Sequence, residues 1–303
     1  MALSFIEILK VVFLGIVEGV TEWLPISSTG HMLLVDEFIS LNASTDFKEM
    51  FFVVIQLGAI LAVVTIFWNK MWPFQLKDKT QPVMKKDTWS MWFKTVVACI
   101  PGAIVTILFD NYIEAHLHTA VVIAIALIFY GIAFIVIENW NKTRTPKVET
   151  LNDITYKTAF LIGMFQVLSI IPGTSRSGST IIGGILAGAT IIGALLIGVS
   201  RVAAAEFTFF LAVPVMFGLS ALKMIKFGLS FTSAEFAILI IGCVVAYLVS
   251  IVVIKFLMSY IKKHDFKIFG WYRIVCQLSY QGITYPENII GILHVYKVYD
   301  YYP

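Results

Sequence analysis

Residues 18–31, EGVTEWLPISSTGH, place two carboxylates, several hydroxyls and a histidine close together within an apolar segment. Glu18 and Glu22 are four residues apart, so on a helix they share one face. Two adjacent carboxylates repel each other unless a cation or a proton lies between them. The pair therefore indicates a metal site or a group that handles protons. The plainer alternative is that both acids face water beside the apolar segment.

The same segment carries a candidate nucleophile. Pro25 predicts the end of the helix that holds the acids. Beyond it, hydroxyls come from Ser27, Ser28 and Thr29, and His31 follows three residues after Ser28. A serine with a neighbouring histidine is the minimum set for nucleophilic catalysis. The alternative is that the serines only cap the next helix, but the acids and the histidine favour catalysis.

A second polar segment, PGTSRSGST at 172–180, interrupts another apolar region. A turn leading into a helix start offers hydroxyls, free backbone N–H groups and the guanidinium of Arg176, a set that suits a phosphate. An arginine in an apolar segment is costly without an anionic partner. Arg176 is therefore expected to bind an anion; the alternative is a permanent pair with Glu18 or Glu22.

The elements that must position these residues are membrane helices. The 303 residues are 59% apolar and 14% charged, whereas soluble chains are roughly 45–50% apolar and about 25% charged. The charges cluster in short stretches and form no basic face, which excludes nucleic-acid binding. Three cysteines without close spacing exclude a disulfide framework and a cysteine-based metal site.

Five apolar segments are long enough to cross a bilayer, whose core needs roughly 20 apolar residues per helix. They are 50–68, 93–109, 119–138, 207–225 and 236–259. Regions 5–40 and 158–200 are also apolar, but the two polar motifs break them near their middles. Broken helices survive at membrane depth only where protein or a wet cavity satisfies the freed backbone groups. Both regions are therefore predicted to be re-entrant hairpins.

Lysine and arginine predict which side of the membrane each connection faces. Loops 69–92 and 139–157 and the stretch after 259 are basic and are expected inside, while 36–49 and 110–118 are acidic and are expected outside. The first hairpin then enters from outside and the second from inside. Inverted repeats bring their broken helices face to face near the midplane. The two motifs are therefore predicted to form one site.

The predicted architecture is an all-α polytopic membrane protein built from two inverted-topology repeats. The first repeat covers 1–157, with hairpin 5–40 and three spans. The second covers 158–275, with hairpin 158–200 and two spans. The tail 276–303 is polar, rich in tyrosine and interrupted by Pro286. It is not expected to cross the membrane, so the final helix of the second repeat is predicted to be lost.

Both motifs resemble those of the undecaprenyl-diphosphate phosphatases, the bacitracin-resistance proteins of the UppP/BacA type. The resemblance runs from about residue 5 to Arg273. It implies a hydrolase of the bacterial inner (plasma) membrane that converts undecaprenyl diphosphate to undecaprenyl phosphate and inorganic phosphate. This reaction recycles the lipid carrier of peptidoglycan synthesis in cell-wall biogenesis and confers bacitracin resistance.

The resemblance also implies a divalent cation, Mg²⁺ or Ca²⁺, and an active site that faces outside. The expected partners are the polyprenyl diphosphate lipid and the bacterial membrane, with no nucleic acid and with a homodimer left open. Carried over residue by residue, the metal ligands are Glu18 and Glu22. The catalytic set is Ser28 as nucleophile, His31 as base or acid, Glu22 and Arg176, with direct attack by His31 left open. The phosphate-binding residues are Ser27, Thr29, Ser175, Arg176, Ser177 and Thr180.

Two features depart from the family. Residues 179–188 and 189–198 form a near tandem repeat, STIIGGILAG and ATIIGALLIG, where members usually have one copy. Ten extra helical residues turn a helix by about 1000°, about 80° short of three turns. The tail also lacks the family's apolar continuation. Either departure predicts a family member with weakened catalysis.

The alternative function is that of a polyprenyl-phosphate transporter or flippase. Inverted repeats with broken helices are a common transporter design.

Overall fold

The structure, a computed structural model, describes residues 4–75, 82–117, 119–142, 145–146, 148–180, 199–228 and 230–284. Over these ranges the chain is helical and its only strand pairing is two isolated β-bridges, which confirms the all-α prediction. The helices are α1 (Phe5–Thr21), α2 (Ser28–Asp36), α3 (Thr45–Val54), α4 (Gln56–Ile66), α5 (Trp68–Met71), α6 (Lys86–Leu117), α7 (Ala120–Asn141), α8 (Tyr156–Gln166), α10 (Arg201–Phe227), α11 (Ser233–Tyr260) and α12 (Lys267–Thr284), with 3₁₀ turns η1 (Leu151–Asp153) and η2 (Val167–Ile170).

Five helical segments in the described residues have the length and composition of membrane spans. They are Thr45–Ile66, Lys86–Phe109, Val121–Asn141, Arg201–Phe227 and Ser233–Tyr260. Each overlaps one predicted span, so the polytopic membrane prediction is confirmed. The connection 110–118 was expected as a loop, but α6 runs on to Leu117 after non-helical dihedral angles at Phe109.

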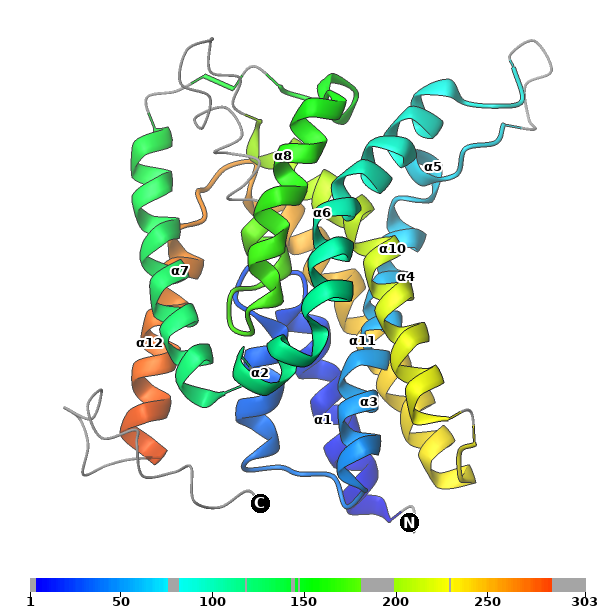
Figure 1. Cartoon of the computed structure of the whole chain (residues 1–303), viewed down its shortest axis with the longest axis vertical. Coiled ribbons are helices and arrows are strands. Elements are labelled where there is room, and N and C mark those ends of the chain that lie inside the picture. Colours follow the sequence, from blue (N-terminus) through cyan, green and yellow to red (C-terminus); the bar gives the residue numbers. More distant parts are fainter. Residues whose placement is uncertain are drawn as a thin grey trace.

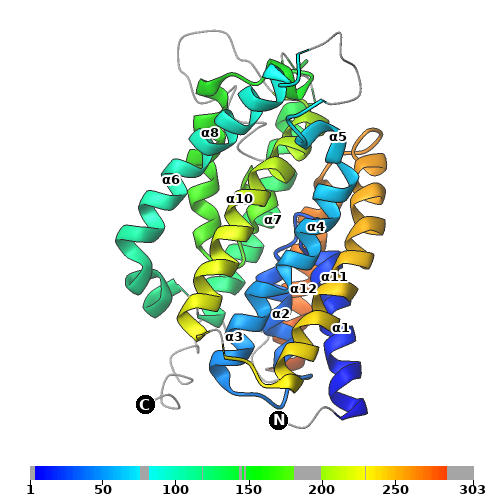
Figure 2. The ribbon, with the colours of Figure 1, turned by 90° about the vertical axis from the view of Figure 1, so that its right-hand side faces the viewer.

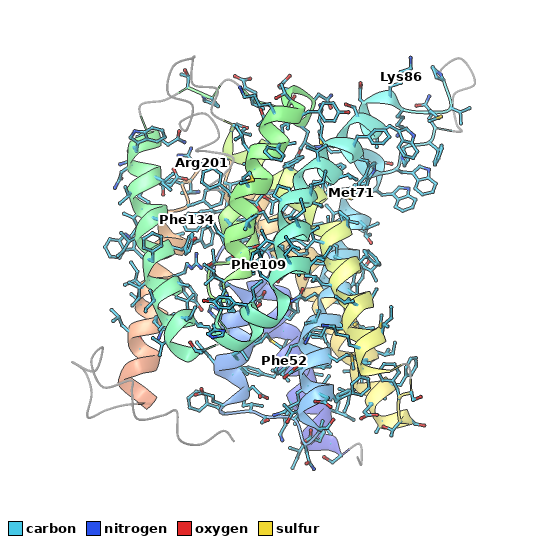
Figure 3. All side chains as sticks on the ribbon, in the orientation of Figure 1. Phe52, Met71, Lys86, Phe109, Phe134 and Arg201 are labelled. Atoms are coloured by element: carbon cyan, nitrogen blue, oxygen red, sulfur yellow. The ribbon has the colours of Figure 1, made fainter. Side chains whose placement is uncertain are left out.

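The basic connections share one end of the molecule. The α5–α6, α7–α8 and α11–α12 connections lie at the upper end in Figures 1 and 2, whereas α2–α3 and α10–α11 are joined at the lower end. Figure 3 shows Lys86 at the upper end and Phe52 near the lower one. In Figure 1, α1 enters from the lower end and α8 from the upper end. The two interrupted helices therefore approach each other from opposite ends.

The helices that lead into the two motifs are packed in the same way. Helix α1 lies along α11, and α8 lies along α6. A Cβ atom added at Gly19 would lie 2.9 Å from the Ala246 carbonyl oxygen, and one at Gly163 would lie 2.2 Å from that of Ala98. Small residues permit such close approach of membrane helices. Such pairing of each interrupted helix with a span of the other half is compatible with two inverted repeats, which stay a prediction.

The upper end is held by an ion pair between the halves of the chain, in which the carboxylate is buried and the arginine is partly exposed. Glu138 near the end of α7 is fully buried. Its carboxylate accepts hydrogen bonds from Arg201 Nε at 2.9 Å and Nη2 at 2.5 Å, and from the Phe266 backbone N–H at 3.1 Å. Glu138 thus connects α7 to the start of α10 and to the segment that begins α12. Figure 3 shows Arg201 near the top of α7.

Helix α12 follows α11 and packs along α7. Its last residues, 276–284, are the part of the predicted tail that the structure describes, and they are helical. Residues 285–303 lie outside the described residues, as does the tandem repeat from residue 181 onward. The predicted loss of the final span and the effect of the repeat stay predictions.

Candidate active site

The first motif begins where α1 ends. The Glu22 N–H donates to the Glu18 carbonyl oxygen at 3.0 Å, so helical geometry extends to Glu22 and both carboxylates lie on one face. Trp23 is buried in the core, with its ring centroid 5.3 Å from that of Phe209. This packing fixes the turn that separates the acids from the serines.

The turn ends at Ser27, which caps α2 in a strained conformation. Its φ angle is 76°, in the region that non-glycine residues rarely adopt. The Ser27 hydroxyl accepts a hydrogen bond from the Gly30 N–H at 3.3 Å. Strain of this kind persists where the surroundings enforce it, often at functional sites. The cap directs the free N–H groups at the start of α2 toward the turn.

The second motif repeats this geometry. Ser175 has a φ angle of 73°, and its hydroxyl accepts a hydrogen bond from the Gly178 N–H at 3.2 Å. A helical turn begins at the next residue, Arg176. Matching Ser175 to Ser27 makes Arg176 the counterpart of Ser28. The two strained caps therefore present a cation from one motif and a hydroxyl from the other.

An arginine from α12 holds the second motif in place. Arg273 is fully buried and donates hydrogen bonds to the carbonyl oxygens of Gly173 and, at 2.7 Å, Thr174. Gly173 has a φ angle of 87°, and a Cβ atom there would lie 2.7 Å from the Ile123 carbonyl oxygen. Sequence reasoning did not assign Arg273 to the site. The feature of the sequence that could have identified Arg273 is its position beside apolar residues, where an arginine is costly unless it has a partner.

Ser28, Glu22 and Arg176 form one connected group. The Ser28 hydroxyl donates a short hydrogen bond to Glu22 Oε2. Arg176 Nη2 lies 3.3 Å from Glu22 Oε1 and donates to Gln56 Oε1 at 3.1 Å. The expected alternative of an Arg176–Glu22 pair is thus present, but Arg176 Nη1 is buried without a hydrogen-bond partner among the described residues. The two N–H groups of Nη1 therefore remain for an anion.

Gln56 was not singled out from the sequence. It is buried, and it starts α4 directly after the interruption at Ile55 that separates α3 from α4. Its amide oxygen accepts from the same nitrogen, Arg176 Nη2, that contacts Glu22 and so helps to orient the guanidinium. A polar residue within an apolar span is the signal that could have identified it.

Both motifs line one small cavity of about 50 Å³. Its lining consists of Glu22, Ser27, Ser28, Thr29, Ser169, Ile171, Pro172, Gly173, Ser175 and Arg176. The structure therefore brings the two motifs together. Ser177 and Thr180 are not in this lining: the Ser177 hydroxyl lies 3.1 Å from that of Ser175, and Thr180 donates to the Arg176 carbonyl oxygen at 2.8 Å.

His31 lies beside the cavity and contacts other groups. Its Nδ1 is 2.7 Å from the Ser27 carbonyl oxygen, and its Nε2 is 3.0 Å from the Tyr272 hydroxyl. The structure thus pairs Ser28 with Glu22, and both ring nitrogens of His31 are engaged elsewhere. The reason is that each side chain has another partner: Glu22 accepts from Ser28, and the Ser27 carbonyl and the Tyr272 hydroxyl bind the imidazole. The catalytic roles of Ser28 and His31 stay predictions.

A comparison with known protein families shows which family the chain belongs to. The model of the bacitracin resistance protein BacA matches residues 11–278. The chain belongs to the BacA family. It is similar to the undecaprenyl-diphosphatase of Enterococcus faecalis, with 74% identity over 284 residues that cover 94% of this chain and 99% of the relative. Proteins with the same name from Lachnoclostridium phytofermentans and Desulfitobacterium hafniense are 62% and 59% identical, covering 90% and 95% of this chain and 95% and 100% of the relatives.

The divalent cation implied by the BacA resemblance can be tested against the acidic pair. Glu18 is fully buried, and neither of its carboxylate oxygens has a hydrogen-bond partner in the described part of the chain. Mg²⁺ and Ca²⁺ prefer such oxygen ligands, and Mg²⁺ is often held by one or two carboxylates plus substrate phosphates. No cluster of three or more His, Cys, Asp or Glu suited to a metal occurs among the described residues. Glu18 and Glu22 therefore fit a cation that shares its remaining ligands with substrate and water.

Proposed function

We propose that this chain hydrolyses undecaprenyl diphosphate to undecaprenyl phosphate and inorganic phosphate. Relatives of up to 74% identity are named undecaprenyl-diphosphatase, and the chain covers nearly the whole length of each. The observation that carries the proposal is the cavity lined by Ser28, hydrogen-bonded to Glu22, and by Arg176 with an unpaired guanidinium nitrogen. As a BacA phosphatase it recycles the lipid carrier of cell-wall synthesis and confers bacitracin resistance.

The first chemical step forms a phosphoserine. The Ser28 oxygen attacks the terminal phosphorus, and its proton passes to Glu22 Oε2 along the hydrogen bond already present. The bond from that phosphorus to the bridging oxygen breaks, and undecaprenyl phosphate leaves with the bridging oxygen and takes the proton. Glu22 thereby performs the proton transfer for which the sequence suggested His31.

The second step releases the phosphate. Water attacks the phosphoserine while Glu22 accepts the proton of the water, and the Ser28 oxygen leaves and recovers a proton from Glu22. The net reaction consumes one water molecule per diphosphate. Arg176 Nη1 and the N–H groups at the two helix starts donate to the phosphate oxygens, where negative charge is greatest. The hydroxyls of Ser27, Thr29 and Ser175 lie in the same lining.

Glu18 and Glu22 hold Mg²⁺ or Ca²⁺ in this proposal. A bound cation supplies positive charge that offsets the diphosphate. The two unpaired oxygens of Glu18 support this assignment, because a buried carboxylate without a partner is costly.

The proposed location is the bacterial inner membrane, with the basic upper end in the cytoplasm and the active site facing outside. Support comes from the basic residues of the upper connections, which are retained on the cytoplasmic side. Hydrolysis of substrate added outside sealed, oriented vesicles tests this orientation. The homodimer stays a prediction, which the mass of the solubilised protein tests.

Transport of a polyprenyl phosphate is the competing function. Two interrupted helices that meet from opposite ends are compatible with it. A transporter has no use for a serine hydroxyl bound to a buried carboxylate, however, whereas hydrolysis requires an activated nucleophile. The contact between Ser28 and Glu22 therefore favours hydrolysis.

One assay separates the two functions. Purified protein in detergent is incubated with undecaprenyl diphosphate, with and without a chelator, and inorganic phosphate is measured. We expect one phosphate per lipid, and no release in the chelator. Binding of the lipid without phosphate release would contradict hydrolysis and favour transport.

A further inference from the structure

Helix α12 brings Tyr272 against the histidine of the first motif. The Tyr272 hydroxyl lies 3.0 Å from His31 Nε2. The two rings are stacked, with centroids 5.6 Å apart and planes 11° from parallel. Cys276, one turn further along α12, has its sulfur 3.8 Å from the same nitrogen. Tyr272, which lies 241 positions from His31 in the sequence, therefore fixes the orientation of the imidazole.

The contacts of His31 define where its proton lies. Nδ1 is 2.7 Å from the Ser27 carbonyl oxygen, which can only accept a hydrogen bond. Nδ1 therefore carries the hydrogen. In the neutral ring Nε2 is then an acceptor, and the Tyr272 hydroxyl donates to it.

The Ser27 carbonyl oxygen connects the contact between His31 and Tyr272 to the proposed nucleophile, Ser28. It accepts from His31 Nδ1 and also from the His31 backbone N–H at 3.2 Å. The carbonyl belongs to the peptide unit that joins strained Ser27 to Ser28. Holding that oxygen fixes the peptide plane, and hence the direction in which the Ser28 side chain leaves the backbone.

We propose that Tyr272 is a positioning residue for Ser28, acting through His31. Its hydroxyl keeps the imidazole in the Nδ1–H form, the imidazole holds the Ser27 peptide, and Ser28 stays directed at Glu22. This inference rests on the proposed hydrolysis through Ser28. It also assigns His31 a role in holding the strained turn, in place of proton transfer to substrate.

The first test is spectroscopic and needs no substrate. Protein with ¹⁵N-labelled histidine gives ring nitrogen resonances, and those of His31 are assigned by their loss in His31→Gln. We expect a protonated Nδ1 and a hydrogen-bonded Nε2 in the native chain. In Tyr272→Phe, which keeps the stacked ring, the Nε2 resonance should move toward the value of an unbonded nitrogen. A native ring protonated at Nε2, or an unchanged spectrum in Tyr272→Phe, would overturn the proposal.

The second test is kinetic. Loss of positioning should lower kcat about tenfold in Tyr272→Phe and leave KM within about twofold, because the substrate phosphate still binds while the nucleophile is misdirected. In a His31→Ala background the same substitution should change kcat by less than about twofold, since residues that act through one another are non-additive. Tyr247→Phe on α11 removes a hydroxyl 3.4 Å from that of Thr65 and should leave kcat unchanged.

The outcomes distinguish this inference from the proposed function. A native chain that releases no phosphate contradicts the hydrolysis, and the nitrogen resonances still decide whether Tyr272 fixes His31. An active native chain with full kcat in Tyr272→Phe overturns the positioning role alone. Additive losses in the double variant overturn it as well, because they would show that Tyr272 does not act through His31.

Discussion

At the scale of single residues, one acidic and one basic side chain of the two motifs carry buried atoms that have no hydrogen-bond partner among the described residues. One is the Glu18 carboxylate and the other is Arg176 Nη1, with Glu22 bound to Ser28 and to Arg176. Unpaired charges are expensive to bury. They are consistent with a site that is completed by an anionic substrate and a cation.

Substitution of Arg176 tests whether its guanidinium binds the anionic substrate. Arg176→Ala should reduce phosphate release about 100-fold or more, because one preorganised donor is typically worth that much. Arg176→Lys should restore only part of the rate, since it supplies a point charge without the planar fork. The measurement is phosphate release by variants that elute as folded protein. More than a tenth of the native rate in Arg176→Ala would be incompatible with the assignment.

Substitution of Glu18 tests whether its carboxylate binds the divalent cation. Glu18→Gln should raise the Mg²⁺ or Ca²⁺ concentration needed for half-maximal activity, because the pair then offers one carboxylate less. Glu7→Gln is the matched control: Glu7 is also buried on α1, but its carboxylate is bound to Lys10 and the Asn42 N–H. Unchanged cation dependence in Glu18→Gln, with only a lower maximal rate, would indicate proton handling instead.

The sequence predicted the residues of the two motifs because hydroxyls and charges within apolar segments are visible in a single stretch of chain. Gln56, Tyr272 and Arg273 were not predicted as site residues. Their contacts arise from the packing of α4 and α12 against distant segments. Nothing local in the sequence encodes such pairings, although Arg273 was visible as a cation beside apolar residues.

At the scale of helices, the site depends on how closely α8 approaches α6. Gly163→Ala would place a Cβ atom 2.2 Å from the Ala98 carbonyl oxygen. Overpacking of this kind costs about 1–3 kcal/mol, so we expect a lower melting temperature and a lower phosphate release rate. Gly218→Ala on α10 is the control, because a Cβ atom there meets nothing within 4 Å. A melting temperature for Gly163→Ala equal to that of Gly218→Ala would contradict this packing.

The spans were predictable because long apolar runs have few alternatives to a membrane helix. Four of the five spans were predicted to start too late, since hydropathy counts apolar residues and misses the polar turns at the helix starts. Helix α11, for example, begins at Ser233 because Thr232 and Glu235 form a capping box before the apolar run. The interruption at Ile55 and the continuation of α6 to Leu117 have no signal in the apolar pattern that defined the spans.

At the scale of the whole molecule, the Glu138 carboxylate joins both halves of the chain. Arg201→Ala should destabilise the protein by about 3–5 kcal/mol, because the fully buried Glu138 carboxylate loses its cation. Replacing both residues by methionine should cost less than the single change. Lys70→Ala breaks the more exposed pair with Glu206 and should cost less than about 1 kcal/mol. Unfolding by denaturant in detergent measures all three, and equal costs for Arg201→Ala and Lys70→Ala would refute the role of Glu138.

The central claim is that Ser28, activated by Glu22, attacks the terminal phosphorus. It is tested most directly by mixing the protein with undecaprenyl diphosphate that carries radioactive phosphorus in its terminal phosphate, quenching rapidly with denaturant at neutral pH so that phosphohistidine also survives, and locating the label by peptide mapping. We predict acid-stable label on Ser28, absent in Ser28→Ala and reduced in Glu22→Gln. Label on His31, or normal phosphate release without label on the protein, would contradict the account.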